Sequence, residues 1–322
     1  MATPTRAAGE APATADTTEY PALYLAAEEA SRRGRRNLSW LAAGDIFFSL
    51  VAALLALLAG LIPAASGATR PTPIDIVLAA TAVPFVVSVT LKLFSLAGGF
   101  EADWYTGRAV AEAVKSMTWR YQMGAAPYHG THADATFAGD ITRMLHRSNL
   151  RQAVNTLTNL PLQITDQMRS SRAQEAGARL DRYVRERLMN QAAWYQARSL
   201  ENRRNANTWF WLSVVLQLAA VATAIIALAL GADANRGSDL LRVMAIFATI
   251  SLAGTAWNER SRFAQLADSY ATTLQELLLA ASLARTTDEN DSLEQAVKEG
   301  EDAILREHRV WLARRVSLVE AD

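Results

Sequence analysis

Four long apolar stretches constrain the fold of this 322-residue chain more than any other feature of its sequence. They cover approximately residues 40–63, 74–98, 208–231 and 240–257. A helix that crosses a bilayer needs about 20 mostly apolar residues, and each stretch reaches or approaches that length. Short polar linkers join the stretches in two pairs, which predicts two helical hairpins. The sequence therefore predicts an all-α integral membrane protein with four transmembrane helices.

The segments outside the apolar stretches predict long cytosolic helices and contain no convincing alternating strand pattern. Helices are expected at 101–122, at 165–205 running into the third span, at 263–283 and near the C-terminus. The segment 124–139 is rich in Gly, Ala, Pro and His and is expected to be a loop. Residues 1–20 are rich in Ala, Thr, Pro and Glu and are expected to form a disordered tail.

Arginine residues cluster on one side of the two hairpins. The clusters comprise Arg32, Arg33, Arg35 and Arg36 before the first span, Arg198, Arg203 and Arg204 before the third, and Arg260 and Arg262 after the fourth. The hairpin tips carry only Arg70 and Arg236. Because basic residues are retained on the cytoplasmic side of a cell membrane, both termini and the middle segment are expected to be cytoplasmic. Such clusters also suit acidic lipids or a nucleotide phosphate, but topology explains all of them together.

An internal repeat is visible where the chain approaches each hairpin. The matching residues are Tyr24, Arg32, Arg33 and Trp40 before the first span and Tyr195, Arg203, Arg204 and Trp211 before the third. The two sets are offset by 171 residues. We therefore divide the chain into two copies of one unit, at 21–150 and 151–322. The alternative is that topology and the interfacial aromatic belt place Arg and Trp before any such hairpin.

Composition narrows the classes of function. Lys plus Arg and Asp plus Glu both number 32, so bulk charge does not favour nucleic-acid binding. The absence of cysteine excludes disulfides, thiolate metal sites and a cysteine nucleophile. No phosphate-binding loop or hydrolase motif is present, so neither an enzyme nor a cofactor is expected. His129, His132 and Asp134 are a weak metal-site candidate, and a solvated loop is the preferred interpretation.

Small residues recur four apart in two of the spans. They are Ala219, Thr223, Ala227 and Gly231 in the third span, and Ala52, Ala56 and Gly60 in the first. Small residues on one helix face allow close helix packing in lipid. The stripes predict either a seam of a pore assembly or a seam within one monomer.

Three polar residues, Asp45, Lys92 and Gln217, lie inside the predicted spans. Asp45 and Lys92 are expected at similar depth in the first hairpin, where they would either pair or extend separately to the interface. Gln217 lies in the middle of the third span and suits either an aqueous path or a hydrogen bond between helices.

Two runs of sequence resemble a known family. The first is Tyr183-Val-Arg-Glu-Arg-Leu-Met-Asn-Gln-Ala-Ala-Trp194-Tyr195-Gln-Ala197, followed by Asn202 and Trp209. The second is Glu112-Ala-Val-Lys115-Ser-Met-Thr-Trp119-Arg120-Tyr121, continuing to Pro127-Tyr128. Both resemble the SLATT family, the SMODS and SLOG-associating two-transmembrane effector domains. The resemblance extends over about residues 20–318 as two copies, although 263–283 lacks the Trp-Arg-Tyr run of the first copy.

The resemblance implies a membrane effector of a prokaryotic conflict system directed against phage. Such an effector would form a homo-oligomeric pore in the lipid bilayer when a nucleotide-making or nucleotide-sensing partner signals infection. The family provides no catalytic motif to transfer. Two other functions remain open: a small membrane transporter or receptor, and a passive membrane anchor for a cytosolic partner.

Overall fold

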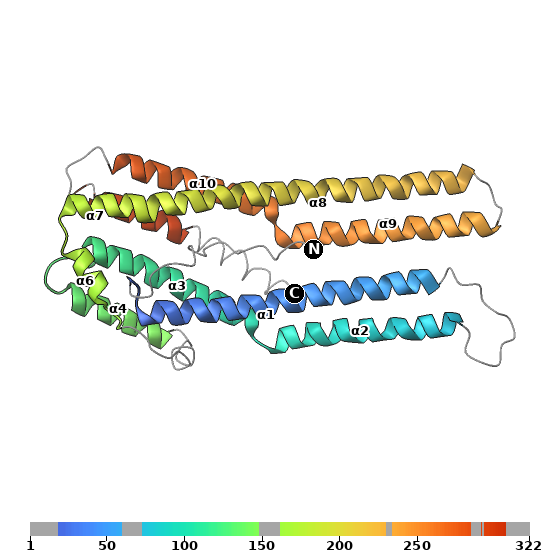
Figure 1. The fold of residues 1–322 in the computed structure, drawn as a ribbon, viewed down its shortest axis with the longest axis horizontal. Helices are drawn as coiled ribbons and strands as arrows, with labels where there is room; N and C mark the ends of the chain where they lie inside the picture. The colour runs from blue at the N-terminus through green and yellow to red at the C-terminus, as the bar shows by residue number, and fades with distance from the viewer. Residues whose placement is uncertain are drawn as a thin grey trace. The chain divides into compact units, whose positions relative to one another are not determined.

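The computed structural model describes residues 19–59, 73–147, 162–229, 234–284, 291 and 293–306. Its elements are α1 (Ala22–Ala59), α2 (Pro73–Ala97), α3 (Phe100–Met123), α4 (Ala133–Arg147), α6 (Asp166–Arg172), α7 (Ala176–Arg182), the π-helix η2 (Tyr183–Met189), α8 (Asn190–Ala229), α9 (Ala234–Ser261) and α10 (Phe263–Leu283). Residues 293–306 are also helical. These ranges contain no β-strand, so the all-α prediction is confirmed (Figure 1).

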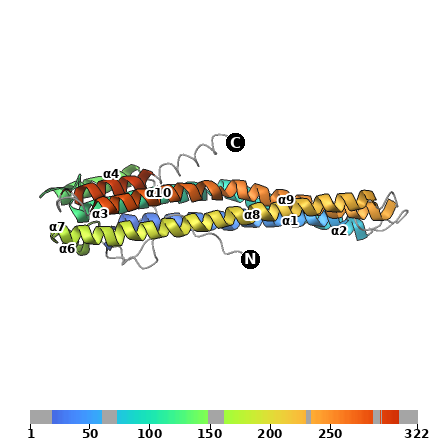
Figure 2. The same cartoon turned by 90° about the horizontal axis from the view of Figure 1, so that it is seen from above.

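The described residues form two compact units. Unit 1 draws on Met1–Arg36, Phe100–Leu200 and Leu266–Asp322, and unit 2 on Asn37–Gly99 and Glu201–Gln265. Helices α1 and α8 each contribute residues to both units. Both views draw α8 as one long helix (Figures 1 and 2).

Unit 2 contains the two hairpins, and its four helices α1, α2, α8 and α9 supply the four candidate membrane spans. A glycine faces the partner helix in each hairpin. A Cβ added to Gly44 of α1 would lie 2.9 Å from Leu91 Cδ1 of α2. In the second hairpin, Gly254 of α9 faces Trp209 and Ser213 of α8. The four predicted spans are confirmed as helices long and apolar enough to cross a membrane.

Unit 1 has two hydrophobic clusters that share α3. One cluster joins Trp119 and Met123 of α3 to η2, the start of α8, α10 and residues 293–306. The other joins Val114 and Tyr121 of α3 to the start of α1, α4 and α6. Helix α3 therefore belongs to both, because its buried residues lie on more than one face.

The order of elements repeats. A long helix, a return span, a following helix and a final helix occur as α1, α2, α3 and α4, and again as α8, α9, α10 and residues 293–306. The turn into the third element has a left-handed residue in both copies, Gly99 with φ 62° and Arg262 with φ 49°. Left-handed residues commonly end helices because they redirect the chain.

Two expectations about the helices require correction. The helix predicted over 165–205 is broken between Arg172 and Ala176, where Glu175 has an extended backbone, and it continues as the π-helical segment η2. The break allows Met168 and Ser171 of α6 to be buried. The loop predicted over 124–139 ends at residue 132, because α4 begins at Ala133 and buries Phe137 against Tyr121 and Tyr128.

Candidate functional site

Hairpin one contains a polar cluster between its two helices. The Ser88 hydroxyl on α2 donates to Asp45 Oδ1 on α1 at 2.6 Å. The Ser49 and Ser88 hydroxyl oxygens are 2.7 Å apart. Ser88 is buried, so this cluster satisfies a carboxylate oxygen that would otherwise face an apolar environment.

Lys92 does not join that cluster. Its side chain is exposed, and among the described residues it forms no ion pair with Asp45. Of the two expected alternatives, the Asp45–Lys92 pair does not form. The Ser88 hydroxyl binds Asp45 instead, because Ser88 lies one helical turn before Lys92 and faces α1.

Hairpin two has a corresponding but uncharged contact. The Ser251 hydroxyl on α9 donates to the Ser213 carbonyl on α8 at 3.1 Å. Ser88 and Ser251 are equivalent in the repeat, since each lies twelve residues before the helix that follows, at Phe100 and Phe263. Both hydroxyls link the two helices of a hairpin, although only the first copy supplies a carboxylate.

The predicted small-residue stripes lie only partly on buried faces. In α8, Ala227 is buried, whereas Ala219 and Thr223 are half-buried. In α1, Ala52 is buried and Ala56 is exposed. Gly60 and Gly231 lie outside the described residues. The buried members favour packing within a hairpin.

The residues that match between the two repeat copies, which we call the repeat signature, include both buried and exposed side chains. Tyr24 and Tyr195 are both buried in unit 1, one in each hydrophobic cluster. Trp40 is 70% exposed and Trp211 is 62% exposed. This is the exposure expected of aromatic residues at a membrane interface.

The four signature arginines have exposed side chains. Arg32 pairs with Glu28 at 3.2 Å, and Arg33 pairs with Glu29 at 2.6 Å, each one helical turn away. Arg203 and Arg204 on α8 are also exposed. Exposed ion pairs of this kind contribute little to the stability of the fold.

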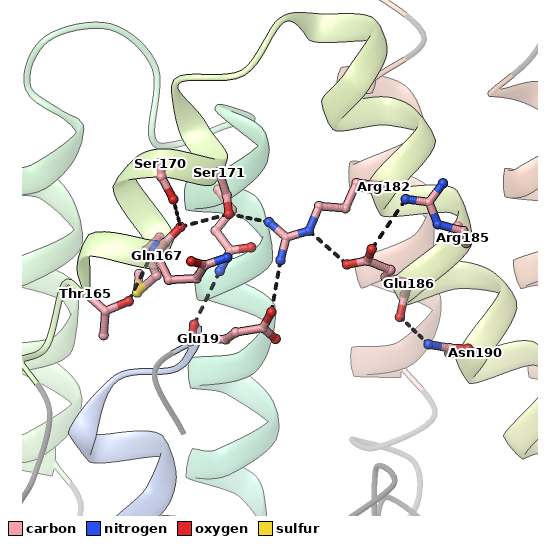
Figure 3. Close-up of polar contacts among 11 residues, drawn as sticks. Glu19, Thr165, Gln167, Ser170, Ser171, Arg182, Arg185, Glu186 and Asn190 are labelled. Carbon is pink, nitrogen blue, oxygen red and sulfur yellow. Dashed lines mark hydrogen bonds and ion pairs between the residues drawn. The ribbon is translucent and has the colours of Figure 1, made fainter. Parts of the chain in front are cut away.

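Arg182 connects several segments of unit 1 (Figure 3). Its Nε donates to Glu186 at 2.8 Å, its Nη2 lies 3.3 Å from Glu19, and its Nη1 donates to Ser171. The guanidinium also lies over the Trp119 ring, 5.6 Å from its centroid. One side chain therefore links the N-terminal segment, α3, α6 and η2.

A buried ionic cluster lies one turn further along η2. The Arg187 Nε and Nη2 atoms each donate to Glu301 at 2.8 Å, and the Tyr183 hydroxyl donates to the same carboxylate at 3.1 Å. Burial and the neighbouring Glu301 charge raise the pKa of Tyr183 well above its ordinary value. Burial lowers the pKa of nearby Lys115. Sequence reasoning missed this cluster, because Arg187 and Glu301 lie 114 residues apart in charged helices.

The two repeat copies are in contact within unit 1. Arg120 of α3 pairs with Asp302 at 2.8 Å, and the Trp119 ring meets the Tyr183 ring edge-on. The backbone N–H of Ala126 donates to Glu294. The cluster that contains Trp119 and Tyr183 therefore combines residues of both copies.

The candidate metal ligands His129, His132 and Asp134 do not form a metal site in the described part of the chain. His129 lies 3.5 Å from Glu294, whereas Asp134 accepts a hydrogen bond from the Tyr121 hydroxyl at 2.5 Å and pairs with Arg169. No group of three or more His, Asp or Glu side chains suited to a metal occurs among the described residues.

These features define a class: a four-span helical membrane protein built from two copies of a hairpin unit. The family model described as SMODS and SLOG-associating 2TM effector domain 3 matches residues 21–180, and the model for domain 1 matches residues 183–311. The chain belongs to this family, the SLATT domains, as two tandem copies. The first match extends to residue 180, beyond the boundary at 150 drawn from the sequence. No curated protein and no solved structure matches the chain.

Proposed function

We propose that this chain is the membrane effector of a prokaryotic anti-phage system. SLATT domains are two-transmembrane effector domains linked to conflict systems, and they are not a known enzyme family. Several copies assemble in the cell membrane and open a pore or disrupt the bilayer. The trigger is a nucleotide-linked signal that a partner protein delivers to unit 1. Unit 1 and both termini of the chain lie on the cytoplasmic side of the membrane.

The continuity of α1 and α8 is the observation that carries this proposal. Each helix begins among buried residues of unit 1, at Tyr24 or Tyr195, and ends in the apolar part of a hairpin. A helix transmits rotation and axial shift along its length because its hydrogen bonds are internal. A signal that shifts unit 1 would therefore bias the arrangement of the spans.

The polar groups of each hairpin support assembly from several chains. Ser88 and Ser251 are occupied by contacts within their own hairpins, so neither lines an open path in one chain. Four helices alone form a packed bundle rather than a channel. A conducting path therefore requires several copies.

The test is expression from a tightly repressed promoter in a bacterium, with and without the candidate nucleotide-signalling partner, while a dye follows membrane potential. The variant N205G/A206G places a flexible hinge in α8, and N205A is the matched control. We expect rapid depolarisation with the native chain and N205A, and its loss with the hinge at equal membrane expression. Equal depolarisation by all three chains would contradict transmission through α8.

The passive anchor is the second candidate, supported by the exposed polar surface of unit 1. Replacing the spans with unrelated apolar helices separates the two functions. An anchor retains its function after the replacement, whereas an effector loses it. A transporter or receptor has weaker support, because the spans in the described ranges are unbroken helices, without the discontinuous helices of many transporter sites.

A further inference from the structure

The turn that ends the second hairpin has a left-handed residue that is not glycine. Arg262 has φ 49°, whereas Gly99 with φ 62° occupies the equivalent place in the first copy. No atom lies within 4 Å of a Cβ added to Gly99, so the backbone conformation rather than crowding explains that glycine. An arginine is costly in this conformation because its Cβ crowds the following carbonyl. Non-glycine residues strained in this way cluster at functional sites.

Arg262 lies level with Arg204 in the antiparallel pair of α8 and α9 (Figure 1). The Trp209 ring of α8 and the Trp257 ring of α9 are 6.4 Å apart between centroids. Arg204 lies five residues before Trp209, and Arg262 lies five residues after Trp257. Five helical residues span about 7.5 Å, so both arginines lie about that far beyond the tryptophans, towards the start of α8. Interfacial tryptophans lie at the level of the lipid headgroups, which places the arginines near the lipid phosphates.

Neither of these two arginine side chains forms an ion pair with another described residue. Arg204 is exposed and Arg262 is half-buried. Glu259 lies three residues before Arg262 and is exposed, but no ion pair joins the two side chains. Both positive charges therefore lack a counter-ion within the described part of the chain.

The first copy treats the equivalent arginine differently. Arg33, which corresponds to Arg204 in the repeat, pairs with Glu29 one helical turn earlier, at 2.6 Å. Leu200 takes the place of that glutamate in the second copy, and it is 64% exposed. The second copy has therefore lost the carboxylate but kept the arginine.

The charge around the ends of the two hairpins differs accordingly. Residues 28–36 and 96–104 of the first copy contain four arginines and four acidic residues. The equivalent residues 199–207 and 259–267 contain four arginines and two acidic residues. The end of the second hairpin is therefore net positive, whereas the end of the first is balanced. A phosphate complements such an excess, because a guanidinium can donate two parallel hydrogen bonds to it.

We propose that Arg204 and Arg262 bind the phosphate group of an anionic phospholipid. Trp211 and Val215 follow Arg204 on the same exposed face of α8 and would contact the acyl chains of that lipid. A soluble phosphate would gain no such apolar contact. Gln217 is also exposed, but it lies about 20 Å beyond Arg204 along the helix, too deep to reach a headgroup. The contact requires only that the chain is inserted in a membrane, and it holds whether or not several copies open a pore.

The probe is phosphatidylglycerol, added to the purified full-length chain in detergent and detected as bound lipid by native mass spectrometry. R262G gives the second copy the glycine of the first, and R204Q removes the other positive charge. R33Q is the matched control, because Arg33 occupies the equivalent place and is already paired. We expect R262G and R204Q each to weaken binding about three- to tenfold, and R33Q to weaken it less than about twofold. Equal binding by all four chains would overturn the proposal.

Thermal unfolding in detergent without added lipid separates this role from a purely structural one. Glycine relieves the left-handed strain, so R262G should raise the unfolding midpoint even though it weakens lipid binding. Added phosphatidylglycerol should then stabilise the native chain more than R262G. A lower midpoint in R262G with unchanged lipid binding would assign Arg262 to the fold and refute the lipid site.

Two further probes identify the source of the phosphate. Phosphatidylcholine carries a positive choline beside its phosphate and should bind more weakly than phosphatidylglycerol. Inorganic phosphate has no acyl chain and should not displace phosphatidylglycerol at the same concentration. Its displacement by inorganic phosphate, or equal binding of the two lipids, would count against an anionic phospholipid as the ligand.

Discussion

The Arg187 guanidinium makes two hydrogen bonds to the Glu301 carboxylate inside unit 1, both 2.8 Å long, and both side chains are almost completely shielded from solvent. The π-helical segment carries Tyr183 to the same carboxylate. One acidic side chain thus fixes two residues of η2. Such a site is sensitive to the loss of either charged member, because the remaining charge stays buried.

The first prediction concerns that pair. E301Q leaves the Arg187 charge buried and uncompensated, so we expect unfolding to become easier by about 3–5 kcal/mol. E276Q is the control, because Glu276 pairs with Arg306 at the surface and its loss should cost about 1 kcal/mol or less. Denaturant unfolding of purified protein in lipid nanodiscs measures both. The double variant R187M/E301L should recover much of the loss, and equal effects of E301Q and E276Q would refute the prediction.

The second prediction concerns helix packing in unit 1. A Cβ on Gly107 would lie 2.7 Å from the Ser31 backbone nitrogen, and one on Gly34 would lie 2.7 Å from the Phe100 carbonyl oxygen. G107A and G34A should therefore destabilise unit 1 by about 1–3 kcal/mol, although alanine is the better helix former.

Gly139 provides the control for those two variants. It lies inside α4, and nothing approaches its added Cβ within 4 Å. G139A should therefore stabilise the protein by up to about 1 kcal/mol. Thermal unfolding midpoints rank the three variants, and a destabilising G139A with a neutral G107A would reverse the expected order.

The third prediction concerns the cluster in hairpin one. S88A removes the hydroxyl that donates to Asp45, and we expect a cost of about 1–3 kcal/mol because a carboxylate loses its donor. S251A removes a bond to a neutral carbonyl and should cost about 1 kcal/mol.

A double-mutant cycle tests the cause of the Ser88 effect. Once D45L has removed the carboxylate, S88A should have little further effect, so the two changes should be strongly non-additive. Unfolding by denaturing detergent provides the free energies. Additive effects would mean that Ser88 acts through packing rather than through Asp45.

The fourth prediction concerns alkaline pH. Burial raises the pKa of Tyr20 to about 12, and burial with the hydrogen bond to Asp134 raises that of Tyr121 to about 12. The ordinary value is 10.0, so the folded state favours the neutral phenol. Their contribution to stability is complete below pH 10 and is lost as the pH rises towards 12.

Tyrosinate absorbance and circular dichroism, recorded in parallel, measure this loss. Late-titrating tyrosines should ionise together with unfolding of unit 1. Y20F should move the alkaline unfolding midpoint to higher pH, because one buried phenol no longer has to ionise. A native-like spectrum with every tyrosine ionised would show that these side chains are accessible in the folded protein.

The membrane spans could be predicted from the sequence because their signal is local. Uncharged runs such as that of the third span specify a helix by length and composition alone. Helix 263–283 was predicted with the bounds observed for α10. The equivalent burial of Tyr24 and Tyr195 also agrees with the sequence repeat, since each belongs to a hydrophobic cluster of unit 1.

The missed features depend on contacts distant in sequence. The break after Arg172 contains no proline, and it serves the burial of Met168 and Ser171 rather than a local backbone preference. Helix α4 begins in a segment with loop-like composition because Phe137 packs against Tyr121 and Tyr128. Asp45 has an obvious charged candidate in Lys92, yet a serine one turn away provides the contact.

The two repeat copies are tandem parts of one polypeptide. Asp45 and Lys92 of the first hairpin are replaced by Leu216 and Thr255 at the equivalent places in the second. Any assembly of this chain must therefore contain the hairpin with Asp45 and Lys92 and the hairpin that lacks them in a one-to-one ratio, whatever its number of subunits. Its smallest repeating element is a pair of unlike hairpins, so the two kinds are free to specialise without either being lost from the complex.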